Sequence, residues 1–293
     1  MRAGRSQPRG APGWRLPGFL LAATLSLWAA LPPGGASAQD IARGEYLAQA
    51  GGCLGCHTEA REGAVAFAGG RALKSPFGTF FGPNITPHAE AGIGRWTEAD
   101  FRRAMREGLR PDGSRYFPAF PYVAFTRITD ADLRDLWAYM RSLPPSPQAS
   151  RPHDLSFPYN LRFGVFFWNL LHFTPGPMPD GKGQAPEARG RYLAEALGHC
   201  GECHTPRDWT GGLRAAERYA GANVAGAKVP PITPERLARW SAGDLSEFLS
   251  SGMTPDGDFA GGEMAEVIRN STGKLTAEDL AALVAFLRAP ARR

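Results

Sequence analysis

The stretch RGEYLAQAGGCLGCHT, residues 43–58, recurs as RGRYLAEALGHCGECHT, residues 189–205. Both contain Arg-Gly-x-Tyr-Leu-Ala followed by Cys-x-x-Cys-His-Thr, and the second carries one inserted residue between these parts. Two further segments recur in register: residues 95–113 match 239–257, and residues 128–143 match 275–290. The chain is therefore an internal duplication, and a Cys-x-x-Cys-His motif lies near the start of each copy.

Each copy predicts three helices separated by long loops, the first of which ends at the cysteine motif. The second helix follows Thr97 or Ser241, which are good N-caps, and stops at Gly108 or Gly252. The last helix has apolar residues spaced i, i+3, i+4, i+7, which indicates packing on a core. Its cap and apolar stripe are Thr129, Leu133, Leu136, Trp137 and Met140 in the first copy, and Thr276, Leu280, Leu283, Val284 and Leu287 in the second. No convincing strand pattern of period two appears, so we expect an all-α fold.

Residues 1–38 have the three parts of a secretory signal peptide. Four arginines precede an apolar run from Leu16 to Leu31, and Ala36-Ser37-Ala38 forms a small-x-small cleavage pattern. The run is short and contains Pro17, which favours a removable leader over a retained anchor. We therefore expect an exported, periplasmic protein, with association at the membrane left open.

The basic character of the chain belongs mostly to this leader. Four of the 33 basic residues and none of the 28 acidic residues lie within residues 1–38. Without them the formal net charge falls from +5 to +1, with 29 basic residues against 28 acidic ones. No basic tract remains that would bind nucleic acid, so we expect no nucleic-acid partner.

The duplication divides the rest of the chain into a first domain (39–145), a linker (146–186) and a second domain (187–293). The linker contains LRFGVFFWNLLHF, residues 161–173. At about 1.5 Å per residue this apolar stretch is too short to cross a bilayer. It is interpreted either as a linker helix that packs against both domains or as a docking face for a partner subunit or the membrane surface.

The cysteine motifs allow three kinds of site. Their residues are Cys53, Cys56 and His57 in the first copy, and Cys200, Cys203 and His204 in the second. A zinc ribbon needs its two Cys-x-x-Cys halves about 15–20 residues apart, and a thioredoxin-like dithiol needs a βαβ setting. Neither condition is met. Cys-x-x-Cys-His does fit haem c, because two thiols can add to the porphyrin vinyl groups while the adjacent histidine binds iron. We therefore expect two covalently bound haem c groups.

With these motifs the chain resembles the dihaem class I c-type cytochromes, and especially the cytochrome c subunits of periplasmic molybdenum-flavin and quinoprotein dehydrogenases. The resemblance covers essentially all of the chain after residue 38. It is carried by SPFGTFFGPNITP (75–87), YFPAFPY (116–122), RPHDLSFPYNLRF (151–163) and LGHCGECHTPRD (197–208). It implies two tandem cytochrome c domains of three to five helices, each around one haem. In such domains the backbone carbonyl of a loop proline such as Pro87 could accept a hydrogen bond from the ring N–H of the proximal histidine.

The resemblance also implies a methionine as the distal iron ligand, in the loop before the last helix. Met264 lies at this place in the second copy. Relatives carry the first methionine at the position of Phe120 or of Ile128, and this sequence has neither. The alternatives are Met105, Met140, Met178, His88, His153 and His172, or an open or weakly held sixth position. The sixth ligand of the first haem is left unassigned.

We expect an electron carrier rather than a catalyst. It would accept single electrons from a periplasmic dehydrogenase and pass them to another cytochrome or an oxidase. A haem enzyme, such as a peroxidase or an enzyme that oxidises sulfur compounds, would instead use an open position on the first haem. A haem-based sensor is disfavoured, because nothing that resembles an output domain follows residue 289.

Overall fold

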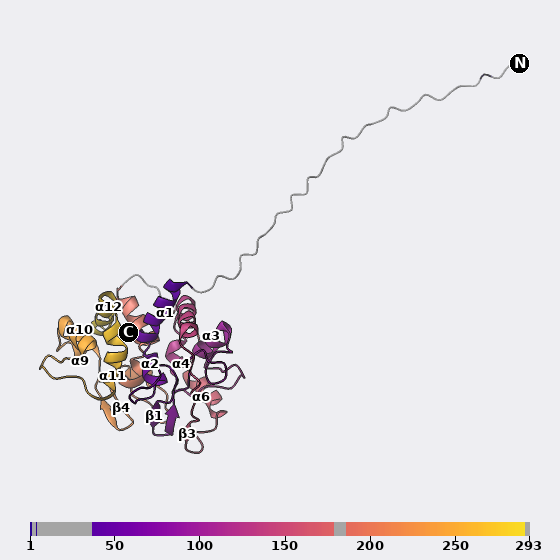
Figure 1. The fold of residues 1–293 in the computed structure, drawn as a ribbon. Coiled ribbons are helices and arrows are strands. Elements are labelled where there is room, and N and C mark those ends of the chain that lie inside the picture. Colours follow the sequence, from indigo (N-terminus) through magenta and orange to yellow (C-terminus); the bar gives the residue numbers. More distant parts are fainter. Residues whose placement is uncertain (2–3, 5–36, 179–185, 291–293) are drawn as a thin grey trace. The chain divides into compact units, whose positions relative to one another are not determined.

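The computed structural model of this protein describes residues 37–178 and 186–290, together with Met1 and Gly4. The contacts group the described residues from Ser37 onward into one compact unit. The expected signal peptide, residues 1–38, therefore lies almost wholly outside the described residues. The described part is rich in helix and also contains two small sheets (Figure 1).

The main helices occur in the same order in both repeats. The first repeat contains α1 (Ala38–Ala50), α2 (Cys53–His57), α3 (Glu98–Glu107), α4 (Tyr122–Phe125) and α5 (Asp130–Ser142). The linker contributes α6 (Gly164–His172). The second repeat contains α7 (Pro186–Tyr192), the π-helix η1 (Leu193–Leu197), α8 (Gly201–His204), the 3₁₀ turn η2 (Ala215–Glu217), α9 (Pro234–Leu237), α10 (Ala242–Ser251), α11 (Gly262–Asn270), the 3₁₀ turn η3 (Thr272–Lys274) and α12 (Ala277–Arg288).

The predicted helix caps are confirmed. Thr97 and Ser241 each accept a hydrogen bond from the backbone of an aspartate at N3, which completes a capping box. Gly108 and Gly252 end these helices in the left-handed conformation, with φ of 64° and 88°. The stripes of α5 and α12 face the interior, where their residues are buried except for the partly buried Trp137.

The prediction of a fold without strands was wrong. In the first repeat β1 (Ala72–Ser75) pairs antiparallel with β2 (Gly78–Phe81), and β3 (Asp154–Leu155) of the linker adds to β2. In the second repeat β4 (Ala222–Val224) pairs with β5 (Ala227–Val229). These strands have two to four residues, which is too short for an alternating pattern to be recognised.

The inserted residue of the second repeat forms a π-helix. In the first repeat the amide of Gly51 donates to the carbonyl of Leu47, which is α-helical spacing. In the second, the amide of Gly198 donates to Leu193, one residue further back. A π-turn absorbs one extra residue in this way. The two cysteine motifs therefore keep equivalent positions despite the insertion.

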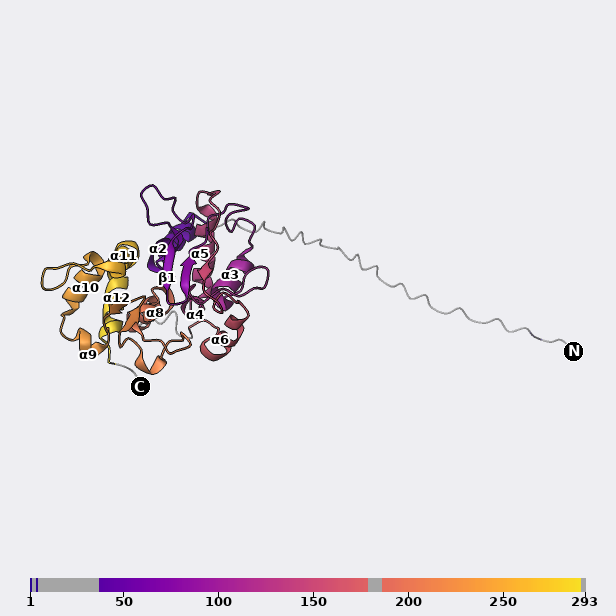
Figure 2. The ribbon, with the colours of Figure 1, turned by 90° about the horizontal axis from the view of Figure 1, so that it is seen from below.

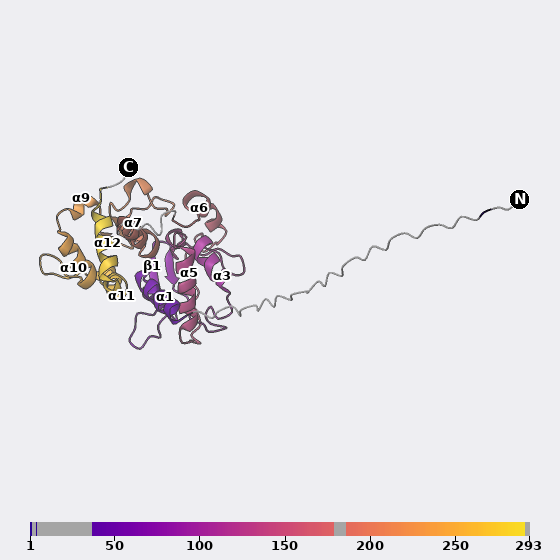
Figure 3. The ribbon, with the colours of Figure 1, turned by 90° about the horizontal axis from the view of Figure 1, so that it is seen from above.

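The first and last helices of each repeat cross in close contact. Helix α1 lies on α5, and α7 lies on α12 (Figures 1 and 3). A Cβ atom at Gly44 would lie 1.9 Å from the carbonyl oxygen of Asp135, and one at Gly190 would lie 2.0 Å from that of Ala282. The glycine of the repeated Arg-Gly-x-Tyr segment is therefore required, because no side chain fits between the crossing helices.

The tyrosine of the same segment connects one repeat to the other. The Tyr46 hydroxyl donates to Asp279 Oδ2 at 2.5 Å, and the Tyr192 hydroxyl donates to Asp132 Oδ2 at 2.6 Å. Each tyrosine thus bonds to the last helix of the opposite repeat, and we call this reciprocal pair the tyrosine clamp. One cluster of buried apolar residues continues through both repeats around it.

Arginines of the repeated segment pair with the same two carboxylates. Arg43 bonds to Asp132 at 2.6 Å, and Arg189 bonds to Asp279 at 2.7 Å and 2.5 Å. Burial works against ionisation of Asp279, but Arg189 and the Tyr46 hydroxyl hold the pKa of its carboxyl below its usual value. Each aspartate therefore pairs with an arginine of its own repeat and accepts a hydrogen bond from a tyrosine of the other repeat.

The linker helix contacts both repeats, as one of its two interpretations predicted. Asn169 of α6 accepts from the hydroxyl of the buried Tyr122 in α4 at 2.6 Å. On the other side, the indole N–H of Trp168 donates to the backbone oxygen of Thr210 at 3.2 Å. Figure 2 shows α6 beside α4, with the segment that follows α8 nearby. The inner side of α6 is thus fixed by polar contacts in two directions.

Candidate haem-binding centres

Each cysteine motif folds as a single helical turn entered through a left-handed residue. Gly52, with φ of 63°, precedes α2, and His199, with φ of 38°, precedes Cys200 at the start of α8. One helical turn brings residues i and i+3 to the same side, so both thiols of a motif face the same way. In the part of the chain that the structure describes, all four cysteines are free of disulfides.

The environment of the thiols does not suit a redox-active dithiol. Burial, with a smaller effect of Cys56, raises the pKa of Cys53 to about 12. Burial likewise raises the pKa of Cys200 to about 12. Reactive dithiols need a lowered pKa, since the thiolate is the nucleophile. Among the described residues, no group of three or more His, Cys, Asp or Glu side chains is placed to hold a metal ion.

A proline carbonyl fixes the tautomer of the histidine in each motif. His57 Nδ1 lies 2.8 Å from the carbonyl oxygen of Pro83, and His204 Nδ1 lies 2.8 Å from that of Pro230. Because a carbonyl can only accept, Nδ1 carries the proton and Nε2 keeps a free lone pair. A metal-binding histidine needs this arrangement. The residues of both motifs therefore fit a haem c, with two thiols for attachment and one imidazole nitrogen for iron.

The expectation that Pro87 would play this part was wrong, although the interaction exists. The backbone at Gly82 runs against the motif so closely that a Cβ there would lie 1.8 Å from the carbonyl oxygen of Cys56. This close approach places the next residue, Pro83, beside the histidine ring. Pro83 and Pro230 occupy the same place in the shared phrases PNITP and PPITP. That shared proline was the signal that sequence reasoning missed.

The side opposite the motif differs between the repeats. In the second repeat Met264 lies on α11, partly buried and packed against the core. In the first repeat Phe120 is also partly buried against the core, with its ring centroid 5.7 Å from that of Phe125 and 5.2 Å from that of Tyr116. An aromatic cluster thus occupies the segment in which the second repeat carries its methionine.

Hydrogen bonds disfavour three of the histidines considered for the first haem. Nδ1 of His153 accepts from the amide of Phe81 at 3.1 Å, and Nδ1 of His88 accepts from Ala91 at 3.1 Å. In these neutral tautomers Nε2 carries the proton and has no lone pair for iron. His172 Nε2 lies 2.7 Å from the Thr210 hydroxyl oxygen. That hydroxyl already donates to Asp208, so His172 Nε2 is a donor as well.

The three methionines considered for the first haem are all buried. Met105 on α3 and Met140 on α5 belong to the apolar core cluster. Met178 lies at the end of the described linker, where its amide donates to the carbonyl of Arg127 at 3.1 Å. It is therefore next to Ile128, the second place at which relatives carry a methionine.

Both motifs lie at the contact between the repeats. Helix α2 faces α11, since a Cβ at Gly55 would lie 3.9 Å from Asn270 Nδ2 and the Ser271 hydroxyl donates to the carbonyl of Ala50 at 2.9 Å. From the other repeat, the His199 ring lies 5.5 Å from the ring of Phe125 in α4. Each cysteine motif therefore contacts the opposite repeat.

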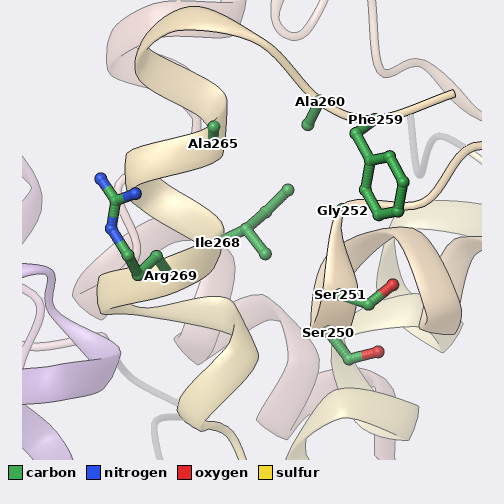
Figure 4. A pocket seen from close by; sticks show the side chains of 8 residues that line it. All are labelled: Ser250, Ser251, Gly252, Phe259, Ala260, Ala265, Ile268 and Arg269. Carbon is green, nitrogen blue, oxygen red and sulfur yellow. The ribbon is translucent and has the colours of Figure 1, made fainter.

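A groove of about 310 Å³ lies between α10 and α11 in the second repeat (Figure 4). It is lined by residues such as Gly252, Phe259 and Ile268, and by none of the motif residues or Met264. At the equivalent place of the first repeat the Tyr122 ring packs against Gly108, and α6 covers it. The groove thus lies at the place that Tyr122 and α6 fill in the first repeat.

Among the described helices, none combines the length and the apolar character needed to pass through a lipid bilayer.

A fold of two repeated helical units, each with a Cys-x-x-Cys-His turn and a fixed histidine tautomer, defines a c-type cytochrome. Residues 41–144 match the family model described as cytochrome c. The chain is 47% identical over 255 residues to a dihaem cytochrome c-type protein of Cereibacter sphaeroides, and this match covers 85% of both chains. The chain belongs to the cytochrome c family.

Other similar proteins are subunits of larger enzymes. The chain is 39% identical to the fructose dehydrogenase cytochrome subunit of Gluconobacter japonicus, over 87% of this chain and 54% of that subunit. It is also 39% identical to the cytochrome c subunit of the quinone alcohol dehydrogenase of Gluconobacter oxydans, over 92% of this chain and 60% of that subunit. The chain thus spans little more than half the length of these two subunits.

Proposed function

We propose that this protein is a dihaem cytochrome c that carries single electrons from a periplasmic dehydrogenase to a downstream cytochrome or oxidase. The observation that carries the proposal is the duplicated turn, in which each motif histidine presents Nε2 while its Nδ1 lies 2.8 Å from a proline carbonyl. The similarity to dehydrogenase cytochrome subunits supports a dehydrogenase as the donor.

The roles of the residues follow from their chemistry. Two haem c groups, when bound, supply the one-electron redox chemistry. Thioether bonds would form at Cys53 and Cys56 and at Cys200 and Cys203, while His57 and His204 bind iron. Met264 would supply the second protein ligand to the iron of the second haem. Partial burial of the histidines lowers their pKa values, which keeps the rings neutral for metal binding.

The proposed arrangement of the chain keeps residues 1–38 as the signal peptide, 39–145 and 187–293 as the two cytochrome domains, and 146–186 as the linker. Helix α1 begins at Ala38, so the first helix starts at the proposed boundary between leader and first domain. Export would place the protein in the periplasm, where haem c is attached.

A redox titration followed by visible spectroscopy tests the carrier function. The holo-protein should show two one-electron steps, and substrate plus the donor dehydrogenase should reduce both haems.

A second candidate, a haem enzyme such as a peroxidase or an enzyme that oxidises sulfur compounds, is favoured by Phe120 at the methionine position of the first repeat. Stoichiometric carbon monoxide binding at one haem together with turnover of peroxide would support this candidate and contradict the carrier.

A further inference from the structure

The outer side of α6 is an apolar surface that no described residue covers. Phe163 at the N-cap, Phe166, Phe167, Leu170 and Leu171 are all exposed, with Leu170 76% exposed. Their spacing of i, i+3, i+4, i+7 and i+8 places them on one side of the helix. The opposite side carries the buried Val165 and Asn169. In contrast to an ordinary amphipathic helix, α6 therefore exposes its large apolar side chains to solvent and buries a polar one, Asn169.

Residues beside α6 extend this surface. Trp209 is 94% exposed, and it precedes Thr210, whose backbone and hydroxyl oxygens bond to α6. On the approach to the helix Phe157, Tyr159 and Leu161 are exposed as well. We call this whole set, from Phe157 to Leu171 together with Trp209, the α6 face.

The size of the α6 face matches a protein interface. With about 200 Å² for a fully exposed aromatic ring, its six aromatic side chains present roughly 800 Å² to solvent. This exceeds the largest apolar patch of a typical monomer, about 300–600 Å². It equals the share of one partner in a standard protein–protein interface, also about 800 Å².

Its construction favours a protein over a lipid surface. Helices that bind membrane surfaces carry Lys and Arg on a polar side that meets the headgroups. Helix α6 contains no Lys, Arg, Asp or Glu, and its polar groups bond to Tyr122 and Thr210 inside the protein. The neighbouring Arg115 guanidinium lies 5.3 Å from the ring of Phe166, and aromatic residues with Arg are typical of interface cores.

The face is also connected to one haem-binding turn. The Arg207 guanidinium, in the segment that carries Trp209, bonds to the carbonyl of Gly211 at 2.9 Å and to Glu202 of α8 at 2.6 Å. A partner seated on the α6 face would therefore lie beside the second cysteine motif.

We propose that the α6 face is the docking surface for the catalytic subunit of the donor dehydrogenase, and that electrons enter at the second haem. This inference rests on the proposed function and specifies its partner contact. The partner must offer a dry, aromatic-lined apolar surface of similar area. Because the inner side of α6 is fixed by hydrogen bonds to Tyr122 and Thr210, docking requires little ordering of the helix.

Site-specific crosslinking in the full-length holo-protein tests the proposal. A photoreactive benzoylphenylalanine at Leu170, in the organism that makes the protein, should crosslink to a dehydrogenase catalytic subunit identified by mass spectrometry. The double substitution Phe167→Glu with Leu170→Glu should weaken that complex at least about a hundredfold, since two interface hot spots are lost. Both side chains are exposed, so haem content and thermal stability should not change.

The matched control is Phe259→Glu, which changes another exposed phenylalanine outside the α6 face and should leave the complex intact. Three results would overturn the proposal: the double variant binds and is reduced as fast as the wild type; Leu170 crosslinks to a second copy of the chain; or vesicles of phosphatidylethanolamine and phosphatidylglycerol bind the wild type and not the double variant. If no dehydrogenase reduces even the wild type, the proposed function itself fails.

Discussion

The two repeats agree in how they hold the cysteine motif and differ on the opposite side. Pro83 and Pro230 contact their histidines at the same distance, and Gly44 and Gly190 allow the same helix crossing. Met264 of the second repeat, however, corresponds to an aromatic cluster around Phe120 in the first. The contacts that hold each cysteine motif are therefore alike in the two repeats, whereas the residues on the opposite side differ.

The largest effect is expected where the repeats are most alike. Gly190→Val and Gly44→Val should each cost more than about 4 kcal/mol and prevent folding, because the new side chain would overlap backbone of the last helix. Urea unfolding followed by circular dichroism measures this. Gly243→Ala on α10 is the control, since only the Ser241 hydroxyl lies near it, and should be neutral or stabilising. A folded Gly190→Val variant with unchanged stability would contradict the crossing.

Exchanging the distal residues should exchange the behaviour of the two haems. Met264→Phe should lower the reduction potential of the second haem and open it to carbon monoxide, because a thioether ligand raises the potential. Phe120→Met should produce a second methionine-ligated spectrum. Magnetic circular dichroism and carbon monoxide titration report both changes. If Met264→Phe leaves both spectra as they were, Met264 is not a ligand.

Removing the tyrosine clamp should have a moderate and unequal effect. Tyr192→Phe should cost about 1.5–3 kcal/mol of unfolding free energy, since a fully buried hydroxyl loses a charged acceptor. Tyr46 is only partly buried, so Tyr46→Phe should cost less. Chemical denaturation of both holo-variants gives the comparison. Equal and negligible losses would show that the clamp does not hold the repeats together.

The smallest expected effect is the pH dependence of the clamp. Burial, and then the carboxylate of Asp279, raise the pKa of Tyr46 from 10.0 to about 12. A raised pKa stabilises the fold fully below the unfolded value, and this stabilisation is lost as pH rises through the folded value. The stability difference between wild type and Tyr46→Phe should therefore be constant up to about pH 10 and vanish near pH 12. A difference that stays constant to pH 12 would contradict this assignment.

The sequence was most informative where it repeats. The duplication revealed both motifs, both capped helices and both apolar stripes, because each is a local pattern that occurs twice. The inserted residue before Cys200 was also visible in the sequence. The π-helix at Leu193–Leu197 that absorbs it was not, because it forms only to keep the second cysteine motif in the same position as the first. Family resemblance added Met264, which no local pattern marks.

Contacts between distant residues could not be predicted in the same way. Asp132, for example, accepts a hydrogen bond from Tyr192, which lies 60 residues away in the other repeat. The histidine partner Pro83 is set by a close backbone approach that only the folded chain reveals. The short strands form because turns at residues such as Gly78 bring the backbone together, and the exposure of the α6 face depends on which side of the helix is fixed by Tyr122 and Thr210.

Peptide mapping of the purified holo-protein by mass spectrometry tests haem attachment at both motifs. Two peptides, one with Cys53 and Cys56 and the other with Cys200 and Cys203, should each carry the mass of one haem. Unmodified thiols or a disulfide in either peptide would contradict the proposed dihaem cytochrome.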